Sequence, residues 1–416
     1  MFRWFSTLTK AQRITFWACF GGWALDALDL QMFSQAIPAL ITTWGISKAE
    51  AGFAGGISLF SLSLGGWLGG WGGDRWGRVR MLQITILWFS AFTLLTAVAQ
   101  NFEQLLVFKA LQGLGFGGEW AVGAALMAEV LPTAVRGRAL GLVQSAWAVG
   151  WGAAVLLYTL IFLYFEPQIA WRILFGIGVL PAFLVLYVRR HIPEPPRIAR
   201  KEESALGASP FVIFTKPLLM TTLIGAAFGV GARGGYYALM TWLPAYLQSE
   251  RHLSISNASG FLAVIIVAFW CGCAVCAFLM DKLGRRNAVV AFSLCCLITV
   301  FVYMYAPLSN SSMLILGFPL GFFAAGVPAS MGAWFSELYP QYARGAGVGF
   351  CYCFGGIVAS FFPALVGKMT EHMSLGIAMA SITCVCYAVV LVSALLLRET
   401  SQQNLDTATA GAGEQH

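Results

Sequence analysis

Charged residues are scarce in this chain of 416 residues: only 10% are Asp, Glu, Lys or Arg, whereas soluble domains carry about 25%. Hydrophobic residues make up 59% of the chain. A soluble protein of this length could not cover its surface with so few charges. The composition therefore excludes a soluble enzyme or binding module and predicts a multi-pass membrane protein surrounded by lipid.

Histidine is scarce as well, and no Gly-rich phosphate-binding loop is present. The four histidines fall in loops or in the tail: His191, His252, His372 and His416. We therefore expect no catalytic residues, no metal site and no cofactor, and we exclude an ATP-driven pump. All ten cysteines fall in apolar runs, where we expect them to be reduced packing residues.

Long apolar runs, by contrast, are abundant. A helix that crosses a bilayer needs about 20 apolar residues, and a backbone in lipid must satisfy its own hydrogen bonds. We therefore predict an all-α membrane protein with twelve transmembrane helices. They cover 14–42, 50–71, 80–99, 104–128, 138–163, 169–188, 217–247, 257–280, 287–306, 312–335, 345–367 and 374–397.

Lys and Arg gather at alternate ends of these runs. With the N-terminus inside, 19 of the 25 lie on the inner side, five lie on or near the outer side, and Arg233 lies mid-span. The positive-inside rule then predicts a cell (inner or plasma) membrane protein with both termini in the cytoplasm. This topology explains the net charge of +7 without a nucleic-acid partner.

The second half of the chain repeats motifs of the first. GDRWGR at 73–78 recurs as MDKLGR at 280–285, and EVLPTAVRG at 129–137 recurs as ELYPQYARG at 337–345, with offsets of 207 and 208 residues. The duplication predicts two homologous six-helix bundles with the same orientation, because six is even. The predicted parts are an N-terminal half (1–188), a cytoplasmic linker (189–215), a C-terminal half (216–398) and a cytoplasmic tail (399–416).

The repeated motifs carry charges at the cytoplasmic ends of helices. Asp74 and Asp281 end the second helix of each half, and a glycine follows that permits a tight turn. Such an acid can pair with a basic group or a helix N-terminus in one conformation and lose that partner in the other. We interpret these charges as a cytoplasmic gate; ordinary topogenic charge is the alternative. The gate residues are Asp74, Arg75, Gly77, Arg78, Glu129, Arg136, Asp281, Arg285, Glu337 and Arg344.

Two carboxylates lie deep in the first run. Asp26 and Asp29 are three residues apart, so on a helix they share a face about 4.5 Å apart along the axis. A charge at bilayer depth costs at least about 2.5 kcal/mol. One of the two is therefore expected to carry a proton, and the pair to titrate as one unit, which suits a proton carrier. The alternatives are a helix end that dips into water and a structural pairing with a neighbouring helix.

The repeat offset places Arg233 at the position equivalent to Asp26. Arg233 lies within GARGGYY, in the middle of the seventh run. It could anchor a carboxylate substrate, with the flanking glycines letting the substrate approach the backbone, or it could hold Asp26 ionised. A structural Arg paired with Asp or Glu is the alternative.

A polar stripe follows the fourth run. Lys109, Gln112, Phe116 and Glu119 share one helix face at 100° per residue. Glu119 is a second candidate for carrying the proton, Lys109 and Gln112 are candidate substrate-binding residues, and Phe116 fits a packing role. Three aromatic residues could line a cavity for the apolar part of a substrate: Tyr236, Tyr237 and Trp147.

Several motifs resemble those of the major facilitator superfamily over roughly residues 10–400. GxxxDRxGR at 70–78 resembles its signature loop, and the copy at 281–286 resembles the second-half partner. LDALD in the first run is similar to the D-G-x-D of aromatic-acid/proton and sialic-acid/proton symporters. KALQGLGFGGEW at 109–120 is similar to their R-x-x-x-G-x-G-x-x-G-E, with Ala27 and Lys109 replacing the usual Gly and Arg. Lys does not clamp a carboxylate at two points as Arg does, so the resemblance does not name the substrate.

This resemblance implies alternating access about a site between the halves. Together with the buried carboxylates, it predicts a proton-coupled secondary active transporter, a symporter, that imports a small organic anion. We expect a monocarboxylate such as an aromatic, sugar or hydroxy acid, with no obligate protein partner. A proton-driven antiporter or exporter and a uniporter are alternatives. The fifth run has glycines but lacks the proline of an exporter signature, and a uniporter would not need the aspartates.

Overall fold

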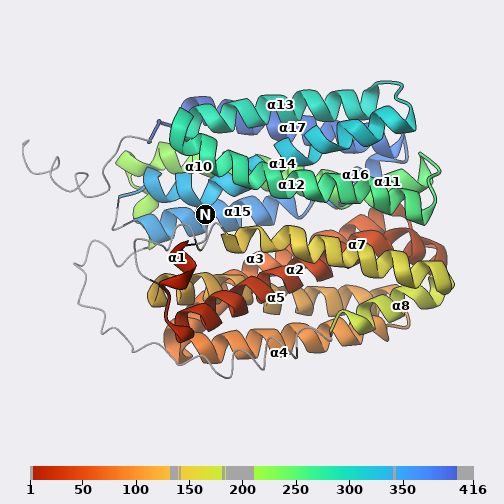
Figure 1. Cartoon of the computed structure of the whole chain (residues 1–416), viewed down its shortest axis with the longest axis horizontal. Helices are drawn as coiled ribbons and strands as arrows, with labels where there is room; N and C mark the ends of the chain where they lie inside the picture. Colours follow the sequence, from red (N-terminus) through yellow and green to blue (C-terminus); the bar gives the residue numbers. More distant parts are fainter. Residues whose placement is uncertain are drawn as a thin grey trace, which may run out of the picture. The chain divides into compact units, whose positions relative to one another are not determined.

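A computed structural model describes residues 3–131, 139, 142–179, 183, 210–340 and 343–400. As far as the structure describes them, the twelve predicted runs lie on a helix or on two consecutive helices (Figure 1), which confirms the predicted all-α fold; parts of the runs 138–163 and 169–188 lie outside the described residues. The helices are α1 (Arg3–Ser6), α2 (Lys10–Trp44), α3 (Lys48–Trp76), α4 (Arg78–Ala97), α5 (Phe102–Val130), α7 (Ala146–Tyr164), α8 (Pro167–Ile177), the 3-10 helix η1 (Pro210–Phe214), α10 (Lys216–Met240), α11 (Leu243–Ser249), α12 (Ile255–Leu283), α13 (Arg285–Tyr305), α14 (Asn310–Leu338), α15 (Arg344–Ala359), α16 (Phe362–Met369) and α17 (Leu375–Leu396).

The helices differ in how apolar they are. Eight helical segments among the described residues are long and apolar enough to cross a membrane on composition alone. Helices α2, α3 and α5 fall outside that set, because they hold buried charges or many glycines. The polar atoms that such helices bring into the membrane need partners inside the protein, which directs attention to the interior between them.

The chain packs as two units. Unit 1 contains Met1–Pro196, Tyr237–Ile266 and Ser360–Met379, and unit 2 contains Arg197–Tyr236, Val267–Ala359 and Ala380–His416. Unit 1 therefore combines the first six runs with two segments of the second half. These units differ from the two halves predicted from the repeated motifs. The units are defined by contacts, whereas the halves reflect a duplication of the sequence.

In unit 1, glycines bring α5 against two neighbours, and Figure 1 shows α2, α3, α4 and α5 running along one another. A Cβ added at Gly117 would meet the Leu62 carbonyl of α3, and one at Gly115 would meet Thr85 of α4. Two faces of α5 are thus closed by backbone contact. A third face, which carries Lys109, is left for α2.

A second close contact in unit 1 joins α3 to α16, and we call it the α3–α16 seam. A Cβ at Gly52 would meet the carbonyl of Pro363, and one at Gly56 would meet that of Ser360. The Trp242 indole donates a hydrogen bond to the Pro363 carbonyl at 2.9 Å. The seam therefore ties segments from the two sequence halves together without side chains between the backbones.

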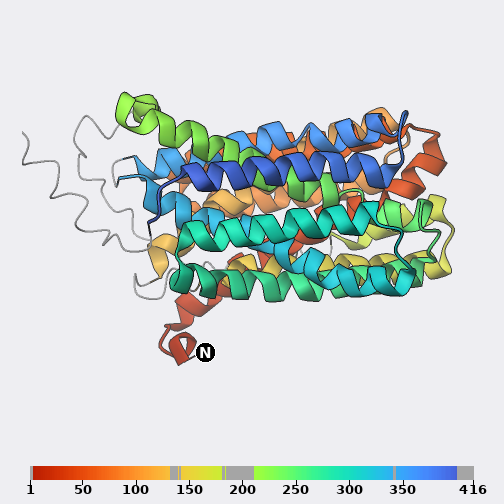
Figure 2. The same cartoon turned by 90° about the horizontal axis from the view of Figure 1, so that it is seen from above.

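In unit 2, helices α13, α14 and α17 run roughly along one another (Figure 2). Phe292 of α13 stacks on Phe322 of α14, with ring centroids 5.6 Å apart. Gly326 leaves room for the Phe292 ring, because a Cβ there would overlap it. Unit 2 is thus held by aromatic packing in addition to glycine contacts.

The two copies of the signature turn have the same backbone. Gly77 has φ 103° and ψ 147°, and Gly284 has φ 91° and ψ 159°. Each glycine precedes the first residue of a helix, α4 or α13. A side chain is strained at such positive φ values, so the repeat preserves glycine for a conformational reason, as the sequence predicted.

Candidate functional site

The first element of the site is a buried ion pair between α2 and α5. Lys109 Nζ lies 3.2 Å from Asp29 Oδ2. Asp29 is 2% exposed and Lys109 is 1% exposed. Burying either charge alone would be expensive, and the partner compensates for the lost hydration. The pair is therefore neutral as a unit.

Gln112 completes this network one turn along α5. Its Oε1 accepts from Lys109 Nζ at 2.6 Å, and its Nε2 donates to Asp29 Oδ1 at 2.9 Å. The second Nε2 hydrogen goes to the Thr93 hydroxyl of α4, which itself donates to the Phe89 carbonyl. Both hydrogens of the amide and its oxygen are thus engaged, so the network fixes the position of both ions.

Two aromatic faces enclose the ammonium. Lys109 Nζ lies 5.1 Å from the ring centroid of Phe33 and 5.7 Å from that of Phe175. A cation over an aromatic face is stabilised by the ring quadrupole, more strongly where water is absent. The rings hold the ammonium without adding a second negative charge, so a single carboxylate balances it.

Asp26 and Asp29 occupy different surroundings on the same helix. Asp29 faces Lys109, whereas Asp26 is fully buried one turn earlier. Between them, Ala27 packs against α7, because a Cβ at Gly150 would meet Ala24 and Ala27. The sequence predicted that the two carboxylates titrate as one unit and did not include a cation. The structure adds Lys109 as the partner of Asp29. Titration of the two carboxylates as one unit stays a prediction.

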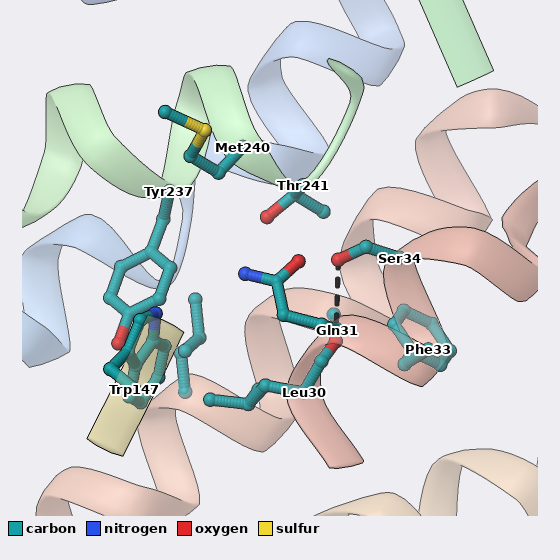
Figure 3. A pocket seen from close by; sticks show the side chains of 10 residues that line it. Leu30, Gln31, Phe33, Ser34, Trp147, Tyr237, Met240 and Thr241 are labelled. Atoms are coloured by element: carbon teal, nitrogen blue, oxygen red, sulfur yellow. Dashed lines mark hydrogen bonds between the residues drawn. The ribbon is translucent and has the colours of Figure 1, made fainter. Parts of the chain in front are cut away.

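A small pocket lies beside the network in unit 1 (Figure 3). Trp147 and Tyr237, two of the predicted lining residues, form part of its wall. Phe33 belongs both to the pocket and to the surroundings of Lys109. The other lining residues are Leu30, Gln31, Ser34, Gly55, Leu59, Met240 and Thr241.

Gln31 is a polar residue of this wall that the sequence analysis did not select. It is 4% exposed, and its Oε1 has no hydrogen-bond partner among the described residues. The signal was present in the sequence, as an amide two residues after Asp29 in an apolar run. It was overlooked because the carboxylates are the more costly groups to bury.

The remaining predicted residues of α5 are also buried. Glu119 and Phe116 are each 3% exposed. The Phe116 ring packs edge-on against Phe89 of α4 at 5.8 Å, which fits the packing role expected for it. The role of Glu119 as a proton carrier stays a prediction.

Arg233 and Tyr236 belong to unit 2. The Arg233 guanidinium lies over the Tyr352 ring at 4.3 Å, and Tyr236 packs against Phe269 at 5.8 Å. Helix α17 fills the space at the neighbouring glycines, since a Cβ at Gly231 or Gly235 would meet it. Gly231 and Gly235 therefore admit a helix and not a substrate, whereas the expectation that Gly234 lets a substrate approach the backbone stays a prediction.

Two of the predicted gate residues, Arg285 and Glu337, form an ion pair in unit 2. Arg285 Nη2 lies 3.0 Å from Glu337 Oε1, with both side chains 17% exposed. The Glu399 carboxylate accepts the backbone N–H groups of Arg285 and Arg286, at 2.8 and 3.0 Å. Arg136 and the side chains of Asp74, Arg75, Arg78, Glu129, Asp281 and Arg344 lie outside the described part of the structure.

Comparisons with known proteins add the family context. The family model described as Major Facilitator Superfamily matches residues 19–318. A probable 4-methylmuconolactone transporter of Cupriavidus pinatubonensis is 41% identical over 403 residues, which are 96% of this chain and 94% of that protein. The cis,cis-muconate transport protein of Acinetobacter baylyi is 29% identical, covering 93% and 94%. A solved D-xylose-proton symporter has the same fold, with a TM-score of 0.77 at 16% identity, covering 94% and 98%.

Proposed function

This chain belongs to the Major Facilitator Superfamily and transports small organic metabolites across a membrane, and we propose that it imports an organic monocarboxylate together with protons. The coupling ion would be the proton, with no other cofactor. The proposed location is the cell membrane, with both termini in the cytoplasm.

The observation that carries this proposal is the Asp29–Lys109 ion pair. In this state the ammonium is balanced by Asp29 at 3.2 Å, so it offers little attraction to a second anion. Protonation of Asp29 would remove its charge and release Lys109 to bind the carboxylate of a substrate. The anion then binds well only when the proton is present, which couples the two fluxes.

The other candidate residues have places in this scheme. Asp26 lies one turn from Asp29 on α2 and is fully buried, so we propose that it passes protons to and from Asp29. Gln112 contacts both members of the ion pair. It would hold Lys109 in place while the partner of the ammonium changes from Asp29 to the substrate carboxylate. Arg233 stays a candidate for contact with the anion, as the sequence predicted.

The names of the relatives support a carboxylate substrate. Muconate is a dicarboxylate, and a 4-methylmuconolactone carries one carboxylate beside an unsaturated lactone ring. The wall of the pocket, with Trp147, Tyr237 and Phe33, suits a flat unsaturated body. We therefore expect a compact unsaturated acid rather than a sugar acid.

Alternating access would open and close the α3–α16 seam. By the positive-inside assignment the seam lies toward the outer side. The described state, in which glycine backbones meet there, would then be closed toward the outside. Separation of these helices would admit the substrate.

Uptake into proteoliposomes tests the proposal. Purified protein would be given an inward proton gradient and a panel of unsaturated lactone acids, aromatic acids, hydroxy acids and neutral sugars, with and without a protonophore. Accumulation of one acid that the protonophore abolishes is the expected result. Uptake that only equilibrates would indicate a uniporter, and expulsion of solute as protons enter would indicate an antiporter.

A further inference from the structure

We propose that Gln31 determines the specificity of the pocket by accepting a hydrogen bond from a neutral hydroxyl group on the transported acid, at the end away from its carboxylate. This inference rests on the proposed function, because its ligand is the organic acid of that transport cycle. It predicts a preference for monocarboxylates that also carry an uncharged hydroxyl group over dicarboxylates.

The first observation is the unused capacity of the Gln31 amide. Its Oε1 is buried without a hydrogen-bond partner in the described structure, and the residue is 4% exposed. Buried polar atoms are nearly always paired in native proteins, so an unpaired one requires an explanation. A ligand that supplies the missing bond is such an explanation.

The second observation is where the amide points. Figure 3 shows the Gln31 amide projecting toward Thr241, with Tyr237 and Trp147 on one side and Ser34 on the other. The Ser34 hydroxyl is occupied, because it donates to the Leu30 carbonyl of its own helix. Gln31 is thus a polar group placed to meet a molecule in the pocket.

The third observation is the charge of the wall. None of the ten lining residues is Asp, Glu, Lys, Arg or His. A carboxylate placed there would lose its hydration without gaining a cation, which is costly. The pocket should therefore accept a neutral hydroxyl, which can donate to Gln31 Oε1, and reject a second carboxylate, while the first carboxylate goes to Lys109 beyond Phe33.

Gln35 provides the matched control. It lies one turn further along α2, is 1% exposed, and neither of its amide atoms has a partner among the described residues. It does not line the pocket. Replacing either glutamine by Leu removes an unsatisfied amide from the same helix, but only Gln31→Leu should change selectivity.

The experiment uses three acids of nearly equal size as competitors: benzoate, 4-hydroxybenzoate and terephthalate, which differ only in the para substituent. Each competes with uptake of the acid identified by the transport panel in wild-type and variant proteoliposomes. For the wild type, 4-hydroxybenzoate should inhibit at about fivefold lower concentration than benzoate, the effect expected for one hydrogen bond. Terephthalate should be the weakest of the three.

The variants then assign the effect to the residue. In Gln31→Leu, and in Gln31→Met as a second variant in case the first folds poorly, 4-hydroxybenzoate and benzoate should become equal. Gln31→Lys should improve inhibition by terephthalate, whereas Gln35→Leu should keep the wild-type order. An order unaffected by substitution at Gln31, an equal change in Gln35→Leu, or no competition by any of the three would overturn the inference.

The test of Gln31 and the test of proton-coupled import can fail independently of each other. Proton coupling is measured by the protonophore in the same vesicles, and selectivity by the ratio of inhibition constants. Uptake that ignores the protonophore but depends on Gln31 for its selectivity would refute symport and keep this assignment. The reverse pattern would refute this assignment and keep symport.

Discussion

Buried polar side chains on two faces of helix α2 differ in whether they have hydrogen-bond partners. On the face toward α5, Asp29 has an ammonium at 3.2 Å and the Gln112 amide at 2.9 Å. A few residues further on, Gln31 and Gln35 have amide atoms without hydrogen-bond partners in the part of the chain that the structure describes. The same helix thus holds a completed network and an incomplete one.

This difference indicates which residues of α2 would gain a hydrogen bond from a ligand and which would have to exchange a partner for it. A completed network already has its partners, so a ligand must displace one of them, and the displacement can be tied to a proton. An incomplete group gains a bond without displacing anything, so it contributes to recognition. Coupling and recognition are therefore assigned to different residues of one helix, and four substitutions test that division.

The largest effect is expected for Lys109→Ala. The substitution leaves the Asp29 carboxylate buried without its cation, which should destabilise the protein by about 3 to 5 kcal/mol and abolish transport. Thermal unfolding in detergent and uptake in vesicles would measure the two losses. The double variant Asp29→Leu/Lys109→Met should recover stability but not transport. Recovery of both would show that the pair is only structural.

Asp26→Asn should separate transport from stability. The amide has nearly the shape of the carboxylate, so expression and thermal unfolding should stay close to wild type. Accumulation against a gradient should be abolished, because the residue no longer carries a proton across the cycle. Exchange of labelled for unlabelled acid at equal pH should persist. Wild-type accumulation by this variant would remove Asp26 from the coupling scheme.

Thr93→Val should weaken the completed network at its edge. The valine has a similar shape but leaves one Gln112 N–H without its acceptor, at a cost of about 1 kcal/mol. We expect a lower unfolding temperature and slower uptake with coupling preserved. Thr96→Val, which removes a hydroxyl bonded only within α4 among the contacts described, serves as the control and should change uptake less.

The smallest effect is expected for Gln35→Leu, and here stability should stay the same or rise and not fall. Replacing a buried, unpartnered amide by an apolar side chain should leave stability unchanged or raise it by up to about 1 kcal/mol. Thermal unfolding without substrate would measure the change. A clear loss of stability would mean that the Gln35 amide is satisfied in the folded protein, and the contrast between the two faces of α2 would disappear.

The fold could be predicted from the sequence because each membrane-spanning helix corresponds to a long apolar run. Hydropathy located the long helices of the described residues, and the repeated turn at Gly77 and Gly284 was predicted from a short motif. The break that divides the predicted run 217–247 into α10 and α11 was missed. Pro244 lies at the start of α11, whereas Pro38, 206 residues earlier in the sequence, stays inside α2. A proline marks a weak point in a helix, but tertiary packing decides whether the helix breaks there.

The site could be predicted only in part. Sequence reasoning selected Asp29, Lys109 and Gln112 because polar groups in an apolar run need a purpose, but it assigned them to separate tasks. Their hydrogen bonds depend on how closely α5 approaches α2, which the glycine contacts of α5 with α3 and α4 determine. Gln31 was missed because an amide is cheaper to bury than a charge and so gives a weaker signal.

The α3–α16 seam has a consequence for how acidity can act on the cycle. The contacts that define it involve glycines, the carbonyls of Ser360 and Pro363, and the Trp242 indole. None of these groups gains or loses a proton in the physiological pH range. These contacts themselves are therefore insensitive to acidity in that range. If acid accelerates the separation of α3 from α16, the cause must be a titratable group outside these contacts, and the pH dependence of opening would report the titration of that group.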